Sequence, residues 1–170
     1  RILLSAGEFL WLDQFGSVGL PSTESAQAVD SDGNAYIAGN IFGVIQEPGG
    51  FGLQDVFVRK YDADGNELWT RQFGSTDYDF AYGVSTDASG VYVAGSTRDV
   101  LPGQASAGGT DAFVRKYDAE GTELWTRQFG SSQSDYASDV SADASGVYVA
   151  GGTSGVLPGQ TSPGWSDVYL

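Results

Sequence analysis

The chain has no cysteine, no histidine and no methionine among its 170 residues. Without cysteine there are no disulfide bonds and no thiolate chemistry. Without histidine there is no imidazole for acid–base catalysis, for a Ser–His–Asp triad or for metal ligation. Because methionine is missing even at position 1, we expect a processed product or a piece of a longer chain.

Basic residues are scarce, with 8 Lys and Arg against 22 Asp and Glu, for a net charge of −14. Such an excess repels nucleic-acid phosphates and anionic membrane surfaces, so we expect no nucleic-acid partner. No apolar run approaches the length of a transmembrane helix, and we expect no membrane insertion. The charge is typical of the solvated surface of a secreted or salt-adapted protein.

An internal repeat dominates what the sequence does contain. Residues 55–74 read DVFVRKYDADGNELWTRQFG, and residues 111–130 read DAFVRKYDAEGTELWTRQFG, a shift of 56 positions. A more diverged copy, LWLDQFGS at residues 10–17, corresponds to LWTRQFGS at residues 68–75. A fixed period of this size indicates one supersecondary unit stacked on copies of itself.

Each unit is predicted to contain four short strands arranged as two hairpins, because turn signals recur and no window has helical periodicity. The predicted strands, A to D, are Ala81–Asp87, Gly90–Gly95, Asp55–Tyr61 and Glu67–Phe73. A four-stranded antiparallel sheet repeated in tandem is the blade of a β-propeller. Strand A is expected to be innermost, because its residues Ala81, Gly83 and Ser85 are small.

We therefore predict an all-β protein, a β-propeller of four-stranded antiparallel blades with three blade equivalents of about 56 residues. It is read as one repeat array over residues 1–170. The predicted parts are 1–16 (the end of strand C, then strand D), 26–74 (a blade), 81–130 (a blade) and 137–170 (strands A, B and the start of C).

The repeated motif resembles a known family. The pattern D-x-F-V-x-K-x-D-x-x-G-x-x-x-W-x-x-x-x-G, followed by A-x-x-V-x-x-D-x-x-G-x-V-Y-V-A-G-x-T, is similar to the bacterial SBBP (seven-bladed beta-propeller) repeat and covers the chain in three copies. The resemblance implies a propeller in extracellular or cell-surface proteins of bacteria and some archaea. It implies no enzymatic activity and no fixed ligand.

The position within the repeat at which the sequence starts and stops bears on whether the blades can close into a ring. Residues 167–170 align with 111–114, and Arg1 aligns with Arg115, so the chain end runs in register into its own beginning. Three blades are too few for a ring, since propellers typically have four to eight. Two expectations stay open: a second copy of the chain closes a six-bladed ring, or the chain is part of a longer propeller.

Two acidic turns, DSDGN at residues 30–34 and DADGNE at 62–67, look like calcium loops. Calcium takes six to eight oxygen ligands, and an EF-hand loop needs twelve residues, so these turns are too short. The equivalent turn at Asp118 also changes the ligand types. We interpret all three as tight turns and expect neither a metal nor another cofactor.

Candidate ligand residues fall into two groups. Asp79 and Asp135 recur before strand A, with Glu24 assigned to that place in the first copy. They either form an acidic rim that binds cations or a basic partner, or accept hydrogen bonds within their own loops. Non-repeating aromatic residues lie in the long loops between strands B and C, where function tends to reside: Phe42, Phe51 and Trp165.

Three functions remain open. The first is a non-catalytic scaffold or binding module of a secreted or cell-surface protein, which presents its B–C loops to a protein or a glycan. The second is a structural spacer with no ligand. The third, ranked last, is a glycan-active enzyme that uses carboxylates, the only catalytic chemistry that this composition leaves.

Overall fold

The computed structural model describes residues 2–5, 8–15, 22–45, 51–161, 164 and 166–170. Within these ranges the protein is all-β without a helix, as predicted. The strands are β1 (Ile2–Ser5), β2 (Glu8–Leu12), β3 (Ser22–Val29), β4 (Ala35–Ile41), β5 (Asp55–Tyr61), β6 (Glu67–Phe73), β7 (Asp79–Asp87), β8 (Gly90–Thr97), β9 (Asp111–Tyr117), β10 (Glu123–Phe129), β11 (Asp135–Asp143), β12 (Gly146–Thr153) and β13 (Asp167–Tyr169).

The strands form antiparallel sheets whose neighbours follow the order of the sequence. The first sheet is β3-β4-β5-β6, the second is β7-β8-β9-β10 and the third is β11-β12-β13, while β1 and β2 pair as an N-terminal hairpin. In both four-stranded sheets the earliest strand lies at one edge and the latest at the other. This is the predicted succession of two hairpins per unit.

The predicted strand limits are met closely in the outer strands and less closely in the inner ones. β5 and β6 have the predicted limits. β7 begins at Asp79 and β11 at Asp135, two residues before the predicted starts, because both residues join the ladder with the next strand. The N-terminal strand D, predicted to end at residue 16, is shorter, since β2 ends at Leu12.

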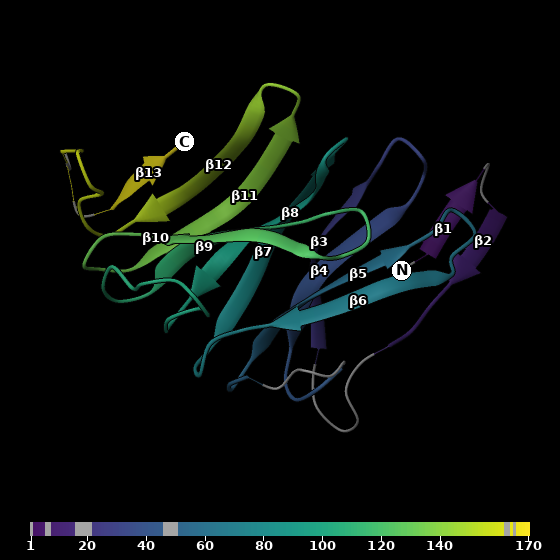
Figure 1. The fold of residues 1–170 in the computed structure, drawn as a ribbon, viewed down its shortest axis with the longest axis horizontal. Helices are drawn as coiled ribbons and strands as arrows, with labels where there is room; N and C mark the ends of the chain where they lie inside the picture. The colour runs from purple at the N-terminus through teal and green to yellow at the C-terminus, as the bar shows by residue number, and fades with distance from the viewer. Residues whose placement is uncertain (1, 6–7, 16–21, 46–50, 162–163, 165) are drawn as a thin grey trace.

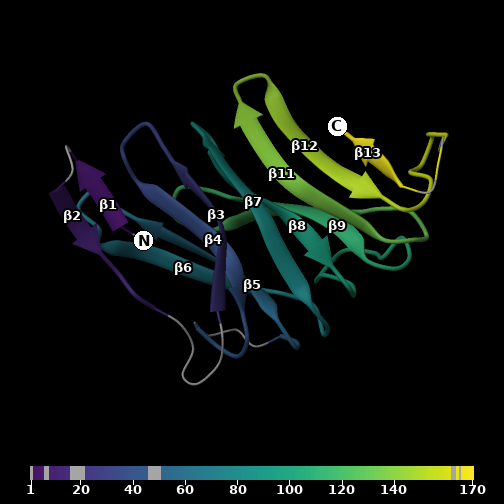
Figure 2. The same ribbon diagram turned by 180° about the vertical axis from the view of Figure 1, so that it is seen from behind.

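The three sheets stand side by side in an arc (Figure 1), and the same order is seen from behind (Figure 2). The first strands of neighbouring sheets lie against one another: β3 against β7, and β7 against β11. Gly83 of β7 explains why small residues are needed there, because a Cβ on it would lie 2.9 Å from the Asp139 Cα in β11. The two chain ends lie at opposite ends of the arc.

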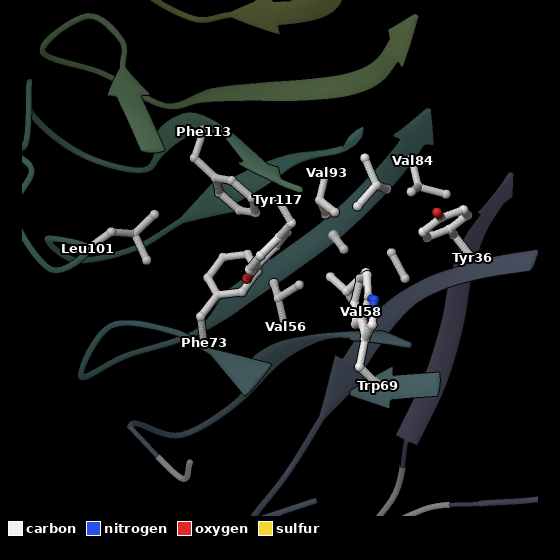
Figure 3. Packing of buried hydrophobic residues seen from close by; sticks show 13 residues of the cluster. Tyr36, Val56, Val58, Trp69, Phe73, Val84, Val93, Leu101, Phe113 and Tyr117 are labelled. Carbon is white, nitrogen blue, oxygen red and sulfur yellow. The ribbon is translucent and has the colours of Figure 1, made fainter. Parts of the chain in front are cut away.

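A hydrophobic core fills the junction between the first and second sheets (Figure 3). Val56 and Val58 come from β5, Val93 from β8 and Val84 from β7, and all are buried. Rings from both sheets complete the core: Tyr36, Trp69, Phe73, Phe113 and Tyr117. Further buried apolar clusters lie on the other faces of these two sheets. Both four-stranded sheets are therefore apolar on both faces, in agreement with the unbroken burial of β4, β5 and β8.

The same aromatic contact recurs at all three junctions between neighbouring units. A phenylalanine in or just after the outermost strand meets a ring of the next unit edge-on, in the pairs Phe15–Phe57 (5.4 Å), Phe73–Phe113 (5.5 Å) and Phe129–Tyr169 (6.0 Å). At the first two junctions an arginine of the next unit also lies over the phenylalanine ring: Arg59 over Phe15 and Arg115 over Phe73. Such edge-to-face pairs add to the energy of area burial.

Polar side chains of the first sheet donate hydrogen bonds to the turn at residues 118–122 of the second sheet. The Trp69 indole N–H donates to the Ala119 carbonyl oxygen (2.9 Å), as does the Lys60 ammonium group (3.1 Å). Arg71 donates through Nε to the Gly121 carbonyl oxygen (2.6 Å). These basic side chains of the outer strands therefore join neighbouring sheets. Among the described residues, none lies in a helix able to span a membrane.

Candidate functional site

The loops that join neighbouring sheets and the long loops after β4 and β8 lie together along one side of the arc, which we call the loop end. It contains residues 42–45, 51–54, 74–78 and 98–110 of the described chain. Three backbone hydrogen bonds connect these segments. Leu53 N–H donates to the Asp77 carbonyl (3.2 Å), Asp79 N–H to the Gln54 carbonyl (2.8 Å) and Arg98 N–H to the Tyr78 carbonyl (3.0 Å). Function placed on such loops would rest on two rigid sheets.

Four aromatic side chains form a row at the loop end: Phe42, Tyr78, Phe80 and Tyr82. The last three alternate along the start of β7, and their rings are almost parallel, with centroids 6.2 Å apart at each step. Phe42, from the first sheet, meets Tyr78 edge-on at 6.4 Å. We call these four residues the aromatic row. It crosses from one sheet to the next.

Polar groups border the aromatic row. The guanidinium carbon of Arg98 lies 5.0 Å from the Tyr78 ring centroid, and its side chain is exposed. The Ser96 hydroxyl donates to the Tyr82 hydroxyl (3.3 Å). Tyr82 is 39% exposed and lies on the edge strand of its sheet, where β7 has a register shift between Ala81 and Gly83. Apolar rings with a few convergent polar groups are the usual composition of a ligand site.

Of the three aromatic residues predicted as ligand candidates, one belongs to the aromatic row and another lies at the same loop end. Phe42 is half-buried and belongs to the aromatic row. Phe51 is 40% exposed at the same end, and its backbone N–H donates to Asp55 Oδ2 (3.0 Å). Trp165 lies outside the described residues.

The sequence analysis missed three residues of the aromatic row: Tyr78, Phe80 and Tyr82. The predicted inner strand of small residues began at Ala81, so Tyr78 and Phe80 were assigned to the loop before it. A usable signal was present, since these aromatics recur at every second position and the third copy has Ser134, Tyr136 and Ser138 instead. Non-repeating aromatics were sought only in the long loops.

Asp79 and Asp135 are fully buried at the starts of β7 and β11. Oδ2 of Asp79 accepts hydrogen bonds from the Ser75 backbone N–H (2.6 Å) and hydroxyl (3.0 Å). Oδ2 of Asp135 accepts the same pair from Ser131, at 2.7 and 3.0 Å. Both carboxylates are thus built into their loops, as the second of the two interpretations expected, and neither stands on an exposed rim.

Burial raises the pKa of Asp79 to about 6. The nearby Thr97 hydroxyl and the hydrogen bonds from Ser75 oppose this rise, and the negative charge of Asp55 adds to it. The Thr97 hydroxyl itself donates to the Asp99 carbonyl oxygen (2.8 Å). Asp79 Oδ1 is therefore left buried without a hydrogen bond.

The assignment of Glu24 to the position of Asp79 is wrong. Asp79 pairs with Thr97 and Asp135 pairs with Thr153, both at the end of the second strand. In the first sheet the corresponding pair is Ser22 with Ile41, whereas Glu24 pairs with Gly39 two residues further in. Sequence spacing could not reveal this, because the loop before β3 differs in length from its counterparts. The Glu24 side chain lies outside what the structure describes.

The acidic turns are closed by their own aspartates, which agrees with their interpretation as tight turns. Asp62 Oδ1 accepts the backbone N–H groups of Asp64 (3.0 Å) and Asn66 (2.8 Å), and Asp118 Oδ1 accepts that of Thr122 (2.7 Å). The Asn66 side-chain hydrogen bond is the largest cause that lowers the pKa of Asp62. Gly65 and Gly121 adopt the positive φ that each turn requires.

Comparison with known proteins gives one partial match. No protein-family model matches the chain. The regulatory protein FlaEY of Caulobacter vibrioides is 32% identical over an alignment 161 residues long, and the alignment covers 85% of this chain. The chain spans only 17% of the length of FlaEY. It is thus similar to one part of a longer protein, and its resemblance to the SBBP repeat stays a prediction.

Proposed function

We propose that the chain is a set of β-propeller blades that serves as a non-catalytic binding module of a secreted or cell-surface protein. Three features support the propeller: complete four-stranded meanders, contact between the first strands of neighbouring sheets, and one aromatic contact repeated at three junctions. Radial repetition of such sheets is the propeller arrangement.

The aromatic row carries the proposal of binding, and a neutral glycan is the ligand class that we propose for it. Buried aromatic rings at the junctions have a packing role, but Tyr82 is 39% exposed in a row that no packing requirement explains. Apolar C–H faces of sugars pack against aromatic rings, and Tyr and Arg supply hydrogen bonds at the edge. The net charge of −14 disfavours an anionic ligand.

Burial of the paired carboxylates supports a role without catalysis. A glycosidase needs two carboxyl groups flanking a sugar that can reach them. One candidate pair at the loop end is Asp55 with Asp79, and these residues are 1% and 0% exposed. The name of FlaEY, a regulatory protein, likewise names no reaction.

A glycan array followed by titration of the best neutral oligosaccharide tests the proposal. Tyr82→Ala and Phe80→Ala should each weaken binding about tenfold or more, equivalent to about 1.4 kcal/mol. Tyr148→Ala is the matched control, since Tyr148 is 49% exposed on β12, away from the aromatic row. It should leave the affinity unchanged.

Two results would contradict the proposed ligand. Equal loss of affinity in Tyr82→Ala and Tyr148→Ala would place binding elsewhere or indicate a general loss of structure, which circular dichroism distinguishes. Absence of any glycan binding would leave a protein ligand or a structural spacer as the function.

A further inference from the structure

Two buried carboxylates converge where the first sheet passes to the second. Asp55 begins β5 and Asp79 begins β7, and these residues are 1% and 0% exposed. A Cβ built on Gly74 would lie 2.3 Å from Asp55 Oδ1 and 2.8 Å from Asp79 Oδ2. Both carboxylates therefore approach the same point of the backbone, close enough for the charge of Asp55 to act on Asp79.

Hydrogen bonds reach only one oxygen of each carboxylate. Oδ2 of Asp55 accepts from the Gln72 amide (2.6 Å) and from the Phe51 backbone N–H (3.0 Å). Oδ2 of Asp79 accepts from the Ser75 backbone N–H and hydroxyl. The Oδ1 atoms of both aspartates are buried without a hydrogen bond. Such burial costs more free energy for a charged carboxylate than for a neutral carboxyl group.

Among the described residues, the charged groups that neighbouring elements bring to this side of the arc are acidic except for one arginine. They are Asp55 at the start of β5, Asp77 before β7, Arg98 and Asp99 after β8, Asp111 at the start of β9, and Asp135 and Asp139 on β11. Arg98 lies over the Tyr78 ring, and the ion pairs of the described chain involve Arg59 and Arg115 instead. A negative charge on Asp79 is therefore not offset by an ion pair there.

We propose that Asp79 is a proton-binding site that sets how tightly the first and second sheets hold together. With a proton on its unsatisfied Oδ1, Asp79 is neutral and the repulsion from Asp55 disappears. The nearby Thr97 hydroxyl can accept that proton in a hydrogen bond, because its own hydrogen goes to the Asp99 carbonyl oxygen (2.8 Å). Loss of the proton leaves two buried negative charges at one junction.

The second junction repeats the convergence around Gly130. A Cβ there would lie 2.7 Å from Asp111 Oδ1 and 2.7 Å from Asp135 Oδ2, so the arrangement is part of the repeat. Asp135 belongs to the three-stranded sheet, whereas Asp55 and Asp79 lie between two complete four-stranded sheets. The proposal is made for the pair that complete sheets enclose.

The raised pKa of Asp79 determines the direction of the pH dependence. Burial raises this pKa to about 6, from 3.8 for an ordinary aspartate. Between these values the folded chain binds more protons than the unfolded chain, so the free energy of unfolding falls as the pH rises. Aspartates with lowered pKa values act in the opposite sense, but only as the pH falls below about 4. They are Asp30, Asp62, Asp87, Asp99, Asp118 and Asp143.

The test measures the proton and its effect on stability separately, at constant salt concentration. In the unaltered chain, ¹³C NMR of the aspartate carboxyl groups should give Asp79 a titration midpoint of about 6. In thermal unfolding, Tm should be lower at about pH 7.5 than at about pH 5, by on the order of 5 °C.

Asp79→Asn places a neutral amide where the protonated carboxyl group lies, so its Tm should change much less between the two pH values. Asp55→Asn removes the neighbouring charge and should move the midpoint of Asp79 to lower pH, which a merely structural role of Asp55 would not do. The matched control is Asp139→Asn, since Asp139 is exposed on β11 and its carboxylate accepts the neighbouring Val140 N–H. It should keep the midpoint of Asp79 and the full change in Tm.

A midpoint of Asp79 at or below that of an ordinary aspartate would overturn the proposal. So would a change in Tm with pH that Asp79→Asn leaves intact. Because the midpoint is measured on the unaltered chain, the test remains decisive even if a variant fails to fold. Failure of glycan binding would not affect it, since neither carboxylate belongs to the aromatic row.

Discussion

Gly95 of β8 lies where the neighbouring strand β7 passes closely. A Cβ on Gly95 would lie 1.8 Å from the Phe80 carbonyl oxygen and 2.9 Å from the Phe113 ring. The first of these atoms belongs to the backbone of a paired strand, so it cannot move without breaking the ladder. This explains the glycine of the repeated VYVAG segment by close approach and not by an unusual φ angle.

We expect Gly95→Ala to destabilise the fold by about 1–3 kcal/mol, the usual range for overpacking. The matched control is Gly146→Ala in β12, where no atom lies within 4 Å of the added Cβ. That substitution should change stability by less than about 0.5 kcal/mol. Urea unfolding followed by tryptophan fluorescence measures both. Equal effects of the two substitutions would show that the Gly95 contact is not the cause.

Single residues were predicted with uneven success, for physical reasons. The acidic turns were interpreted correctly because a local pattern of Asp, Gly and Asn determines a local structure. Glu24 was misplaced because its strand position depends on pairing with Gly39, which no local pattern encodes. The aromatic row was missed because its rings come together only when two sheets pack, as the contact between Phe42 and Tyr78 shows.

At the scale of one strand, β6 shows how the sheets are joined. Phe73 is 3% exposed, meets the Phe113 ring edge-on and lies under Arg115. Leu68, on the same strand, is 51% exposed. The strand therefore carries both a junction anchor and a solvent-facing residue of similar apolar character.

We expect Phe73→Ala to cost about 3–5 kcal/mol, the usual range for a buried phenylalanine. Phe129→Ala at the next junction should cost less, because Phe129 is only half-buried. Leu68→Ala should fall within about 0.5 kcal/mol of the unaltered protein. Denaturant unfolding measures all three, and a cost of Leu68→Ala equal to that of Phe73→Ala would contradict the assigned role of the junction.

Strands were predictable because alternation of apolar residues and strong turns both act within a few residues. β5 and β6 fulfil that expectation. The earlier starts of β7 and β11 follow from the burial of Asp79 and Asp135 between two sheets, and that depends on partners about 24 residues earlier in sequence, such as Asp55. Composition alone places an aspartate in a loop.

At the scale of the whole molecule, the third sheet has an open edge. β13 pairs only with residues 151–153 of β12, whereas β9 pairs with residues 91–97 of β8. Val147 and Tyr148 are consequently 36% and 49% exposed, against 0% and 3% for Val91 and Tyr92 in the second sheet. A long unpaired edge of this kind tends to recruit another strand.

A hollow of about 660 Å³ lies beside β13. It is lined by Thr153, Leu157, Gln160, Asp167 and Tyr169, among others. In the second sheet the corresponding space holds Gln128 of β10, which accepts the Leu101 N–H (2.9 Å) and donates to Asp111 (2.7 Å). The hollow thus has the position of a strand equivalent to β10.

A chain extended after Leu170 by a copy of residues 115–130 should fill both the hollow and the open edge. The added segment repeats the rest of β9 and all of β10, so it can pair with β12 in the register that the second sheet already uses. Burial of the Val147 and Tyr148 side chains by the added segment should raise the free energy of unfolding by on the order of 2–3 kcal/mol. That corresponds to an increase in Tm of about 5–10 °C for a domain of this size.

The extension also tests the proposed second copy of the chain. If the N-terminal hairpin of another copy covers the open edge, light scattering should give a dimer for the original chain and a monomer for the extended one, whose edge is already occupied. A scrambled extension of the same composition is the control, and it should leave both Tm and mass unchanged. If the original chain is monomeric at all concentrations, the ring of two copies is wrong. If the extension leaves Tm unaltered, the propeller register is wrong, because the open edge is then not a vacant strand position.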